Sequence, residues 1–210
     1  MSDLSLHLFG PDSATVVLLA HGAGAGHDSP FMQTMAAGLA ERGCRVGLFD
    51  FPYMQQARRE GRRRPPSAMP KLIESWQEVI QLAGSQGASR LVIGGKSMGG
   101  RMASLVADEC EVAGLVCLGY PFHPPANPEK TRTEHLAGLV TPTLVVQGER
   151  DRFGTPGEVA GYELSGSIRI HWMPDGDHDL VPRKRSGRTA EQNWAEAADA
   201  ILGFFISIVG

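Results

Sequence analysis

The sequence predicts an α/β fold: one domain over residues 1–210, built on a mostly parallel sheet of about six or seven strands with helices on both faces. The first observation behind this prediction is that short β-rich runs alternate with helical patterns along the chain. The second is that several runs are continuously apolar, such as VVLLA at 16–20 and LVV at 144–146, which is typical of strands covered on both faces. A length of 210 residues suits one domain with a substantial core.

The expected strands share a run of apolar or β-branched residues that is bounded by polar residues or glycine. They cover residues 15–20, 45–49, 91–93, 114–118, 143–147 and 168–173.

Helices are expected where a start signal precedes apolar residues at helical spacing. Ser29 followed by Pro30 fits an N-cap with proline at the first helical position. Pro70 opens a second helix, which we expect Gly84 to end, and a third follows Ser97. The last helix carries an apolar stripe that we expect to pack in the core. The stripe consists of Trp194, Ala198, Ile201, Phe205 and Ile208.

Charge and composition exclude several classes of function. The net charge of −3 lacks the basic excess of a general nucleic-acid binder, and no apolar run is long enough to cross a bilayer. The N-terminal residues lack the pattern of a secretory signal. Cys44, Cys110 and Cys117 are odd in number and have no metal-type spacing, so we expect reduced thiols in a cytoplasmic protein.

Residues 95–99, GKSMG, match the G-x-S-x-G pattern of a nucleophile elbow. The pattern stands between an expected strand and an expected helix, where a direct turn strains the backbone of the central Ser97. We expect Gly95 and Gly99 to be crowded against each other, so that neither position tolerates a side chain. The turn presents the hydroxyl of Ser97, the expected nucleophile, beside the backbone N–H of Met98.

Asp151 and His178 follow in the chain order that accompanies such an elbow. Each comes just after an expected strand, so a parallel sheet brings both to the same edge as Ser97. His178 would take the hydroxyl proton, and Asp151 would orient the imidazole and stabilise its charged form. Glu149 is the alternative acid.

Residues 21–29, HGAGAGHDS, form a glycine-rich loop after the first expected parallel strand, and two functions fit it. A dinucleotide-binding unit would continue into a strand ending at Asp50, but its third glycine is replaced by His27, so we set this function aside. The other function is an oxyanion hole, made by the backbone N–H groups of Ala23 and Met98, with Gly24 as the neighbouring candidate.

Several blocks of sequence carry a family resemblance: HGAGAGHDSPFM, FDFPYM, RRPP, GGKSMGGRMAS, GYPFHPP, QGERDRFG and DGDHDL. Across residues 15–205 they resemble a small, dienelactone-hydrolase-like group of α/β-hydrolase-fold proteins. This group includes a testis-expressed animal protein and the hydrolase-like domain of an NSL chromatin-complex subunit. The resemblance implies an α/β-hydrolase fold and a triad of Ser97, Asp151 and His178, without naming a substrate. Because few residues precede the first parallel strand, the antiparallel opening pair of the superfamily is expected to be missing or reduced to residues 4–9.

Five arginines within residues 58–64 are either solvated or form a basic rim. Such a rim would bind a carboxylate- or phosphate-bearing substrate, with Arg64 as the candidate ligand, or an acidic protein partner. Gly24 and His123 are further candidates for substrate contact. Lys96, inside the elbow, either points to solvent or tunes the site.

No metal or other cofactor is expected. The DGDHD segment superficially resembles a calcium loop, but it lacks the glycine and the glutamate that such a loop needs, where Leu180 and Ser186 stand instead. No set of histidine, cysteine and carboxylate residues has catalytic zinc spacing.

The sequence therefore predicts a serine hydrolase that cleaves a small ester or thioester through an acyl-enzyme, with an anionic acyl substrate as one candidate. We expect an open site without a full cap domain, roofed by two long loops at 51–68 and 120–132. The alternative is a catalytically silent hydrolase-fold module that binds a protein partner in a complex.

Overall fold

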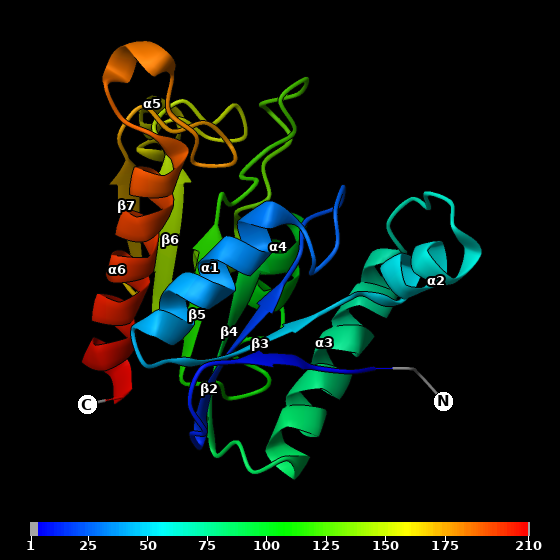
Figure 1. Cartoon of the computed structure of the whole chain (residues 1–210). Coiled ribbons are helices and arrows are strands. Elements are labelled where there is room, and N and C mark those ends of the chain that lie inside the picture. The colour runs from blue at the N-terminus through cyan, green and yellow to red at the C-terminus, as the bar shows by residue number, and fades with distance from the viewer. Residues whose placement is uncertain (1–3, 210) are drawn as a thin grey trace.

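The computed structural model of the chain describes residues 4–209 and is built on a single seven-stranded sheet (Figure 1). The strands are β1 (His7–Phe9), β2 (Thr15–Ala20), β3 (Arg45–Phe49), β4 (Arg90–Lys96), β5 (Gly114–Leu118), β6 (Thr143–Gly148) and β7 (Ile168–Met173). Their order across the sheet is β1-β3-β2-β4-β5-β6-β7, and only β1 runs antiparallel to its neighbour. The predicted mostly parallel sheet is confirmed, and the opening pair is indeed reduced to the short β1.

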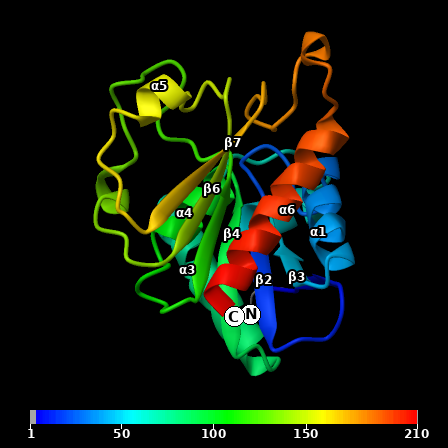
Figure 2. The same cartoon turned by 90° about the vertical axis from the view of Figure 1, so that its left-hand side faces the viewer.

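Helices cover both faces of the sheet, as predicted. They are α1 (Pro30–Glu41), α2 (Pro52–Glu60), α3 (Met69–Ser85), α4 (Met98–Ser104), α5 (Pro156–Val159) and α6 (Ala190–Val209). Figure 2 shows α1 and α6 on one side of the sheet, with α3 and α4 on the other. Among residues 4–209, no helix combines the length and the apolar character that a membrane span needs.

Two hydrophobic cores follow from the alternation of side chains along the buried strands. In β2, Val16 and Leu18 pack in the core beneath α3 and α4, whereas Val17 and Leu19 pack beneath α1 and α6. Because helices cover both faces of the sheet, the residues that point to either face are buried. The strands therefore have continuous apolar runs instead of an alternation of apolar and polar residues. The stripe on α6 packs in the second core, with Ala198 and Ile201 fully buried or nearly so.

The helix starts were predicted more accurately than the helix ends. Ser29 caps α1, and its Oγ accepts a hydrogen bond of 3.4 Å from the backbone N–H of Met32. The expected stop at Gly84 is wrong: α3 ends at Ser85, and Gly87, with a φ of 92°, adopts the left-handed conformation beyond it. A second correction concerns residues 51–68, which were expected as a loop but contain α2.

The order of the strands places an opening at the carboxyl ends of β2 and β4. The chain leaves β2 to form β3 on one side, whereas β4, on the other side of β2, is followed by β5 farther along the sheet. The loops after β2 and β4 therefore diverge from adjacent strands, and such switch points are where open α/β sheets bind ligands. At the outer borders lie the three-residue β1 and β7, whose Arg169 is exposed.

Candidate active site

The serine expected at the elbow lies between β4 and α4. Ser97 has φ 50° and ψ −114°, a strained conformation for a residue other than glycine. Two backbone hydrogen bonds hold it: its N–H donates to Leu118 (2.9 Å), and its carbonyl accepts from Arg101 (3.0 Å). The strain is therefore supported by the neighbouring strand β5 and by the first turn of α4.

Gly95 and Gly99 must lack side chains, as expected, but the group that crowds them is the backbone of β2. A Cβ on Gly99 would lie 2.5 Å from the carbonyl oxygen of Ala20 and 2.7 Å from that of His21. A Cβ on Gly95 would overlap the same Ala20 oxygen, and Gly95 also has a φ of 147°. The two glycines are thus crowded against the end of β2 rather than against each other.

Ser97, His178 and Asp151 form a continuous hydrogen-bonded chain. The Oγ of Ser97 lies 2.9 Å from Nε2 of His178, whose Nδ1 lies 2.8 Å from Oδ2 of Asp151. An ionised carboxylate can only accept, so Nδ1 carries the proton and Nε2 is left to accept from the serine hydroxyl. The three residues expected to meet at this sheet edge are therefore brought together.

The carboxylate of Asp151 is fully buried and accepts three hydrogen bonds. Besides His178, it accepts from the side-chain amide of Gln147 (2.9 Å) and the backbone N–H of Phe153 (2.9 Å). Glu149, the alternative acid, instead accepts from the backbone N–H of Asp175. Gln147 was not singled out in the sequence, because nothing in its local pattern indicates a pairing with the loop that follows its own strand.

Lys96, which the sequence left undecided, is buried rather than solvated, with only 9% of its side chain exposed. Its ammonium group donates to the carbonyl oxygen of His178 (2.6 Å) and lies 3.2 Å from Oδ1 of Asp179. It also lies 5.6 Å from the centre of the Phe31 ring. Burial lowers the pKa of Lys96, and the nearby carboxylates oppose this shift. The residue ties the elbow to the loop that carries His178.

Ser97 and His178 open into a cavity of about 570 Å³. The glycine loop (residues 21–29) supplies one wall through its residues 22–25, and the start of α1 supplies another. Phe31, Phe153 and Trp194 make the lining largely apolar. The expectation that loops 51–68 and 120–132 roof the site is wrong for this cavity, because none of its lining residues comes from either loop.

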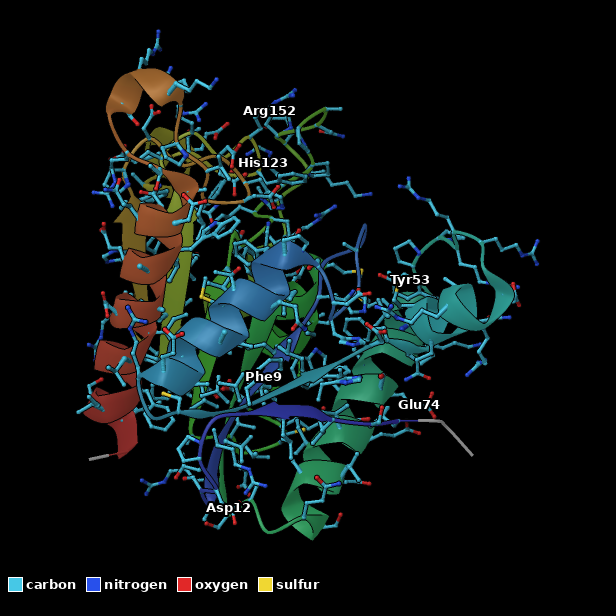
Figure 3. The ribbon with its side chains drawn as sticks, viewed as in Figure 1. Phe9, Asp12, Tyr53, Glu74, His123 and Arg152 are labelled. Atoms are coloured by element: carbon cyan, nitrogen blue, oxygen red, sulfur yellow. The ribbon has the colours of Figure 1, made fainter. Side chains whose placement is uncertain are left out.

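Of the three residues expected to contact substrate, Gly24 and Arg64 line cavities and His123 does not. Gly24 lines the cavity beside Ser97 and also a second cavity of about 400 Å³, which Arg64 lines together with other residues of the arginine-rich segment. His123 lines neither cavity and is only 1% exposed. Its backbone N–H donates to Phe153 (3.2 Å), and its Nε2 lies 3.5 Å from Glu158. In Figure 3, His123 lies beyond the carboxyl ends of the strands, well away from Tyr53 on α2. The interpretation of His123 as a pocket residue is therefore wrong.

The two backbone groups expected to form the oxyanion hole belong to the start of α4 and to the glycine loop. Met98 is the first residue of α4, so its N–H has no partner within the helix. Ala23 follows Gly22, and a Cβ on Gly22 would lie 3.7 Å from the Cβ of Ser97. The glycine loop therefore runs directly beside the serine. No group of three or more histidine, cysteine or acidic residues within residues 4–209 is arranged to hold a metal ion.

Comparisons with known proteins agree with this architecture. A family model described as an alpha/beta hydrolase domain matches residues 13–206. Ferulic acid-bound Est1E from Butyrivibrio proteoclasticus is similar in structure, with a TM-score of 0.74, 14% identity and coverage of 98% of each chain.

Two further solved structures share the fold at low identity. A dienelactone hydrolase from Anabaena variabilis has a TM-score of 0.72 and 21% identity over 99% of this chain and 93% of its own. XC6422 from Xanthomonas campestris, an α/β serine hydrolase without a lid, has a TM-score of 0.71 and 16% identity over 94% of this chain and 88% of its own.

Proposed function

Because the chain belongs to the alpha/beta hydrolase family, we propose that it is a serine hydrolase that cleaves a small ester or thioester through an acyl-enzyme. The observation that carries this proposal is the hydrogen-bonded chain from Ser97 through His178 to Asp151, which begins at an open cavity. The similarity to an α/β serine hydrolase and to a dienelactone hydrolase supports the reaction class. The narrower relationship to the testis-expressed protein and the NSL subunit stays a prediction.

In the proposed reaction, the Oγ of Ser97 attacks the carbonyl carbon of the substrate while its proton passes to Nε2 of His178. The backbone N–H groups of Met98 and Ala23 would stabilise the negative charge on the carbonyl oxygen. When the intermediate collapses, His178 returns the proton to the leaving alcohol or thiol. Water then attacks the acyl-enzyme by the same route, and the acid and free Ser97 are released.

The proposed role of Asp151 is electrostatic. Its carboxylate stays ionised and stabilises the imidazolium that His178 becomes in each half-reaction. The two further donors on this carboxylate, from Gln147 and Phe153, support this role because they stabilise its charged form.

The substrate we propose is small and carries a negative charge. An apolar cavity of about 570 Å³ supports a compact acyl group. The adjoining cavity supports a carboxylate or phosphate on the same substrate, because residues 23–25 line both cavities and residues 62–64 supply three arginines. Arg62 and Arg64 share a single carboxylate, that of Glu60, so these three arginines exceed their partner in charge. A pair of p-nitrophenyl esters, one neutral and one carrying a carboxylate, tests this: kcat/KM should favour the charged ester and lose that preference at high salt.

Labelling with a fluorophosphonate probe tests the enzyme itself. We expect wild type to be labelled and to hydrolyse p-nitrophenyl acetate, and Ser97→Ala to do neither. Ser85→Ala is the matched control, since Ser85 is an exposed serine at the end of α3. An unlabelled wild type, or equal labelling of Ser97→Ala, would refute the proposal and leave the interaction module as the function to pursue.

The three free cysteines support our proposal of a cytoplasmic location, because reducing compartments keep such thiols unpaired. Burial raises the pKa of Cys44 and Cys117, so neither thiol is a competing nucleophile.

A further inference from the structure

The glycine loop beside Ser97 is held mainly from outside. Its end is closed by a backbone hydrogen bond from the N–H of Ser29 to the carbonyl of Gly26 (3.1 Å). Within the described part of the chain, the N–H groups of residues 22–26 make no hydrogen bond. They are free to donate to an oxyanion, but they do not help to hold the loop in place. Its position must therefore come from its carbonyl groups and from its two ends.

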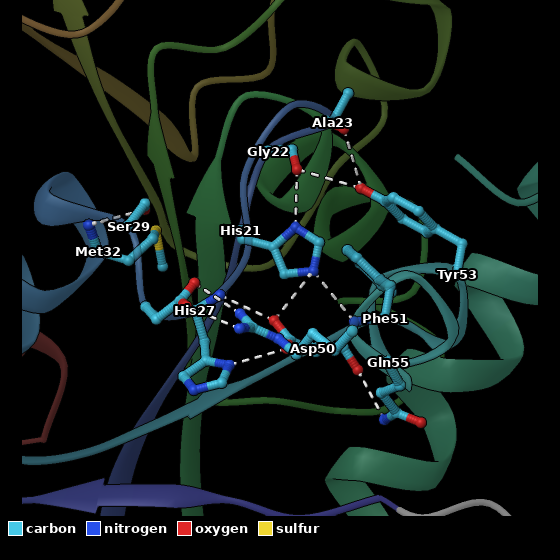
Figure 4. Close-up of polar contacts among 12 residues, drawn as sticks. His21, Gly22, Ala23, His27, Ser29, Met32, Asp50, Phe51, Tyr53 and Gln55 are labelled. Carbon is cyan, nitrogen blue, oxygen red and sulfur yellow. Dashed lines mark hydrogen bonds and ion pairs between the residues drawn. The ribbon is translucent and has the colours of Figure 1, made fainter. Parts of the chain in front are cut away.

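Two aromatic side chains hold the first half of the loop (Figure 4). The hydroxyl of Tyr53, on α2, lies 3.2 Å from the carbonyl oxygens of both Gly22 and Ala23. His21 accepts from the backbone N–H of Phe51 (3.1 Å) and donates through Nδ1 to the carbonyl of Gly22 (2.7 Å). A ring that accepts at one nitrogen and donates at the other is neutral, and burial lowers the pKa of His21 accordingly. Because the carbonyls of Gly22 and Ala23 are bound on the α2 side, the peptide planes of the loop are fixed.

Ion pairs around the buried carboxylate of Asp50 hold the second half. Asp50, at the end of β3, accepts from the backbone N–H of His27 (2.8 Å) and lies 2.9 Å from Nδ1 of the same residue. Arg58, on α2, donates to Asp50 (2.6 Å) and binds the carboxylate of Asp28 through both terminal nitrogens (2.7 and 2.5 Å). One guanidinium therefore joins β3 to the end of the loop.

The loop is packed directly against the ion pair of Arg58 and Asp50. A Cβ on Gly26 would overlap a terminal nitrogen of Arg58 and lie 2.8 Å from Oδ1 of Asp50. A side chain at this position would push the guanidinium of Arg58 away from Asp50, so the packing of the loop and the ion pair depend on each other. Backbone donors stabilise a developing oxyanion only when they are placed to within a fraction of an ångström. We therefore expect a support that touches the loop to influence how strongly its N–H groups stabilise the transition state.

We propose that Asp50, Tyr53 and Arg58, the anchoring group, are positioning residues that hold the backbone N–H of Ala23 toward the oxyanion formed at Ser97. This inference rests on the proposed hydrolase function and deepens it. It also gives α2 a role in the reaction, although α2 contributes no residue to the cavity beside Ser97. Asp50 and Tyr53 line neither cavity, and Arg58 lines only the second one. For a neutral ester, which has no charged group to place in the second cavity, the anchoring group therefore acts through the loop.

The test compares Arg58→Ala and Tyr53→Phe with wild type, using kcat and KM for a neutral ester together with the affinity of a boronic acid that forms a tetrahedral adduct on serine. Removing one oxyanion donor outright costs about 10²–10³ in kcat, so a loosened donor predicts a loss of about 10- to 100-fold with KM little changed. Boronate affinity should fall in proportion to kcat. Tyr53→Phe keeps the ring and removes only the hydroxyl, and Arg58→Lys, which keeps one charged donor, should recover part of the loss.

Arg42→Ala is the control, because Arg42 makes a comparable surface ion pair with Asp199, joining α1 to α6 far from the anchoring group. It should change neither kcat nor boronate affinity. If both Arg58→Ala and Tyr53→Phe keep kcat within about twofold of wild type, or if KM rises while kcat stays constant, the positioning role is refuted and the proposed function stands. If wild type itself hydrolyses no ester and takes no fluorophosphonate, both proposals fail.

Discussion

Replacing Gln147 by leucine is expected to damage both stability and catalysis. Leucine is close to glutamine in volume, so the change removes polar atoms without opening a large cavity. The amide of Gln147 is fully buried, and its Oε1 accepts from the backbone N–H of Tyr120 (2.7 Å) while its Nε2 donates to Asp151 (2.9 Å). After the change, both partners remain buried, one without its acceptor and the other without one of its three donors.

The magnitude follows from these two groups. The buried N–H of Tyr120, left without a partner, costs about 1–3 kcal/mol, and the lost hydrogen bond to the charged Asp151 costs about 1.5–3 kcal/mol. Together they give a loss of about 2.5–6 kcal/mol in the free energy of unfolding. Asp151 also becomes less well oriented toward His178. Losing about 1.4 kcal/mol of the stabilisation of the imidazolium would lower kcat about tenfold.

Urea denaturation and steady-state ester hydrolysis measure the two effects. Gln77→Leu is the control, since Gln77 is only partly buried on α3 and its amide makes a long, exposed hydrogen bond of 3.5 Å to Glu109. Its effect on the free energy of unfolding should stay within about 0.5 kcal/mol. If Gln147→Leu destabilises the protein by less than about 1 kcal/mol and leaves kcat unchanged, then Gln147 does not support Asp151 in the way its hydrogen bonds indicate.

Three further predictions concern other contacts of the site. Gly99→Ala should lower the free energy of unfolding by about 1–3 kcal/mol and also reduce kcat, because its Cβ would press on the end of β2; a melting temperature equal to that of wild type would contradict this. Lys96→Met should lower kcat about tenfold in the ester assay, because the hydrogen bond to the carbonyl of His178 is lost, and unchanged kinetics would show that this tie is dispensable. The hydrogen bonds from Arg58 lower the pKa of Asp28 from 3.8 to about 2, so their stabilisation is present above pH 4 and lost as the pH falls toward 2. The melting temperature of Asp28→Asn should therefore fall less over that range than that of wild type, and parallel curves would argue against the linkage.

The sheet could be predicted from the sequence because its strands are buried on both faces. Four of the six expected parallel strands have the predicted bounds, and β4 and β6 extend farther, through glycines and polar residues that carry no strand signal. By contrast, α2 was missed because Tyr53 is its only buried residue, so it has no apolar face to detect. Its stability comes from contacts with distant residues, such as those of Arg58 with Asp28 and Asp50.

The same distinction applies to the candidate site. Ser97, Asp151 and His178 could be singled out because their chemistry requires a fixed chain order and a place after a strand. The role of Gln147 depends on which loop folds back over β6, and no local pattern records this. His123 was misplaced for a similar reason, since its partner Phe153 precedes α5 and its partner Glu158 lies in α5, both far along the chain from His123.

The borders of the sheet bear on how the protein behaves at high concentration. A strand with unpaired N–H and C=O groups can recruit a second molecule and seed fibrous aggregates. Here one border offers only three residues of β1, and the other carries the exposed guanidinium of Arg169, which a docking strand would have to desolvate. We therefore expect concentrated samples to resist amyloid-type association. Removing β1, or replacing Arg169 by a neutral residue, should make the protein more prone to it.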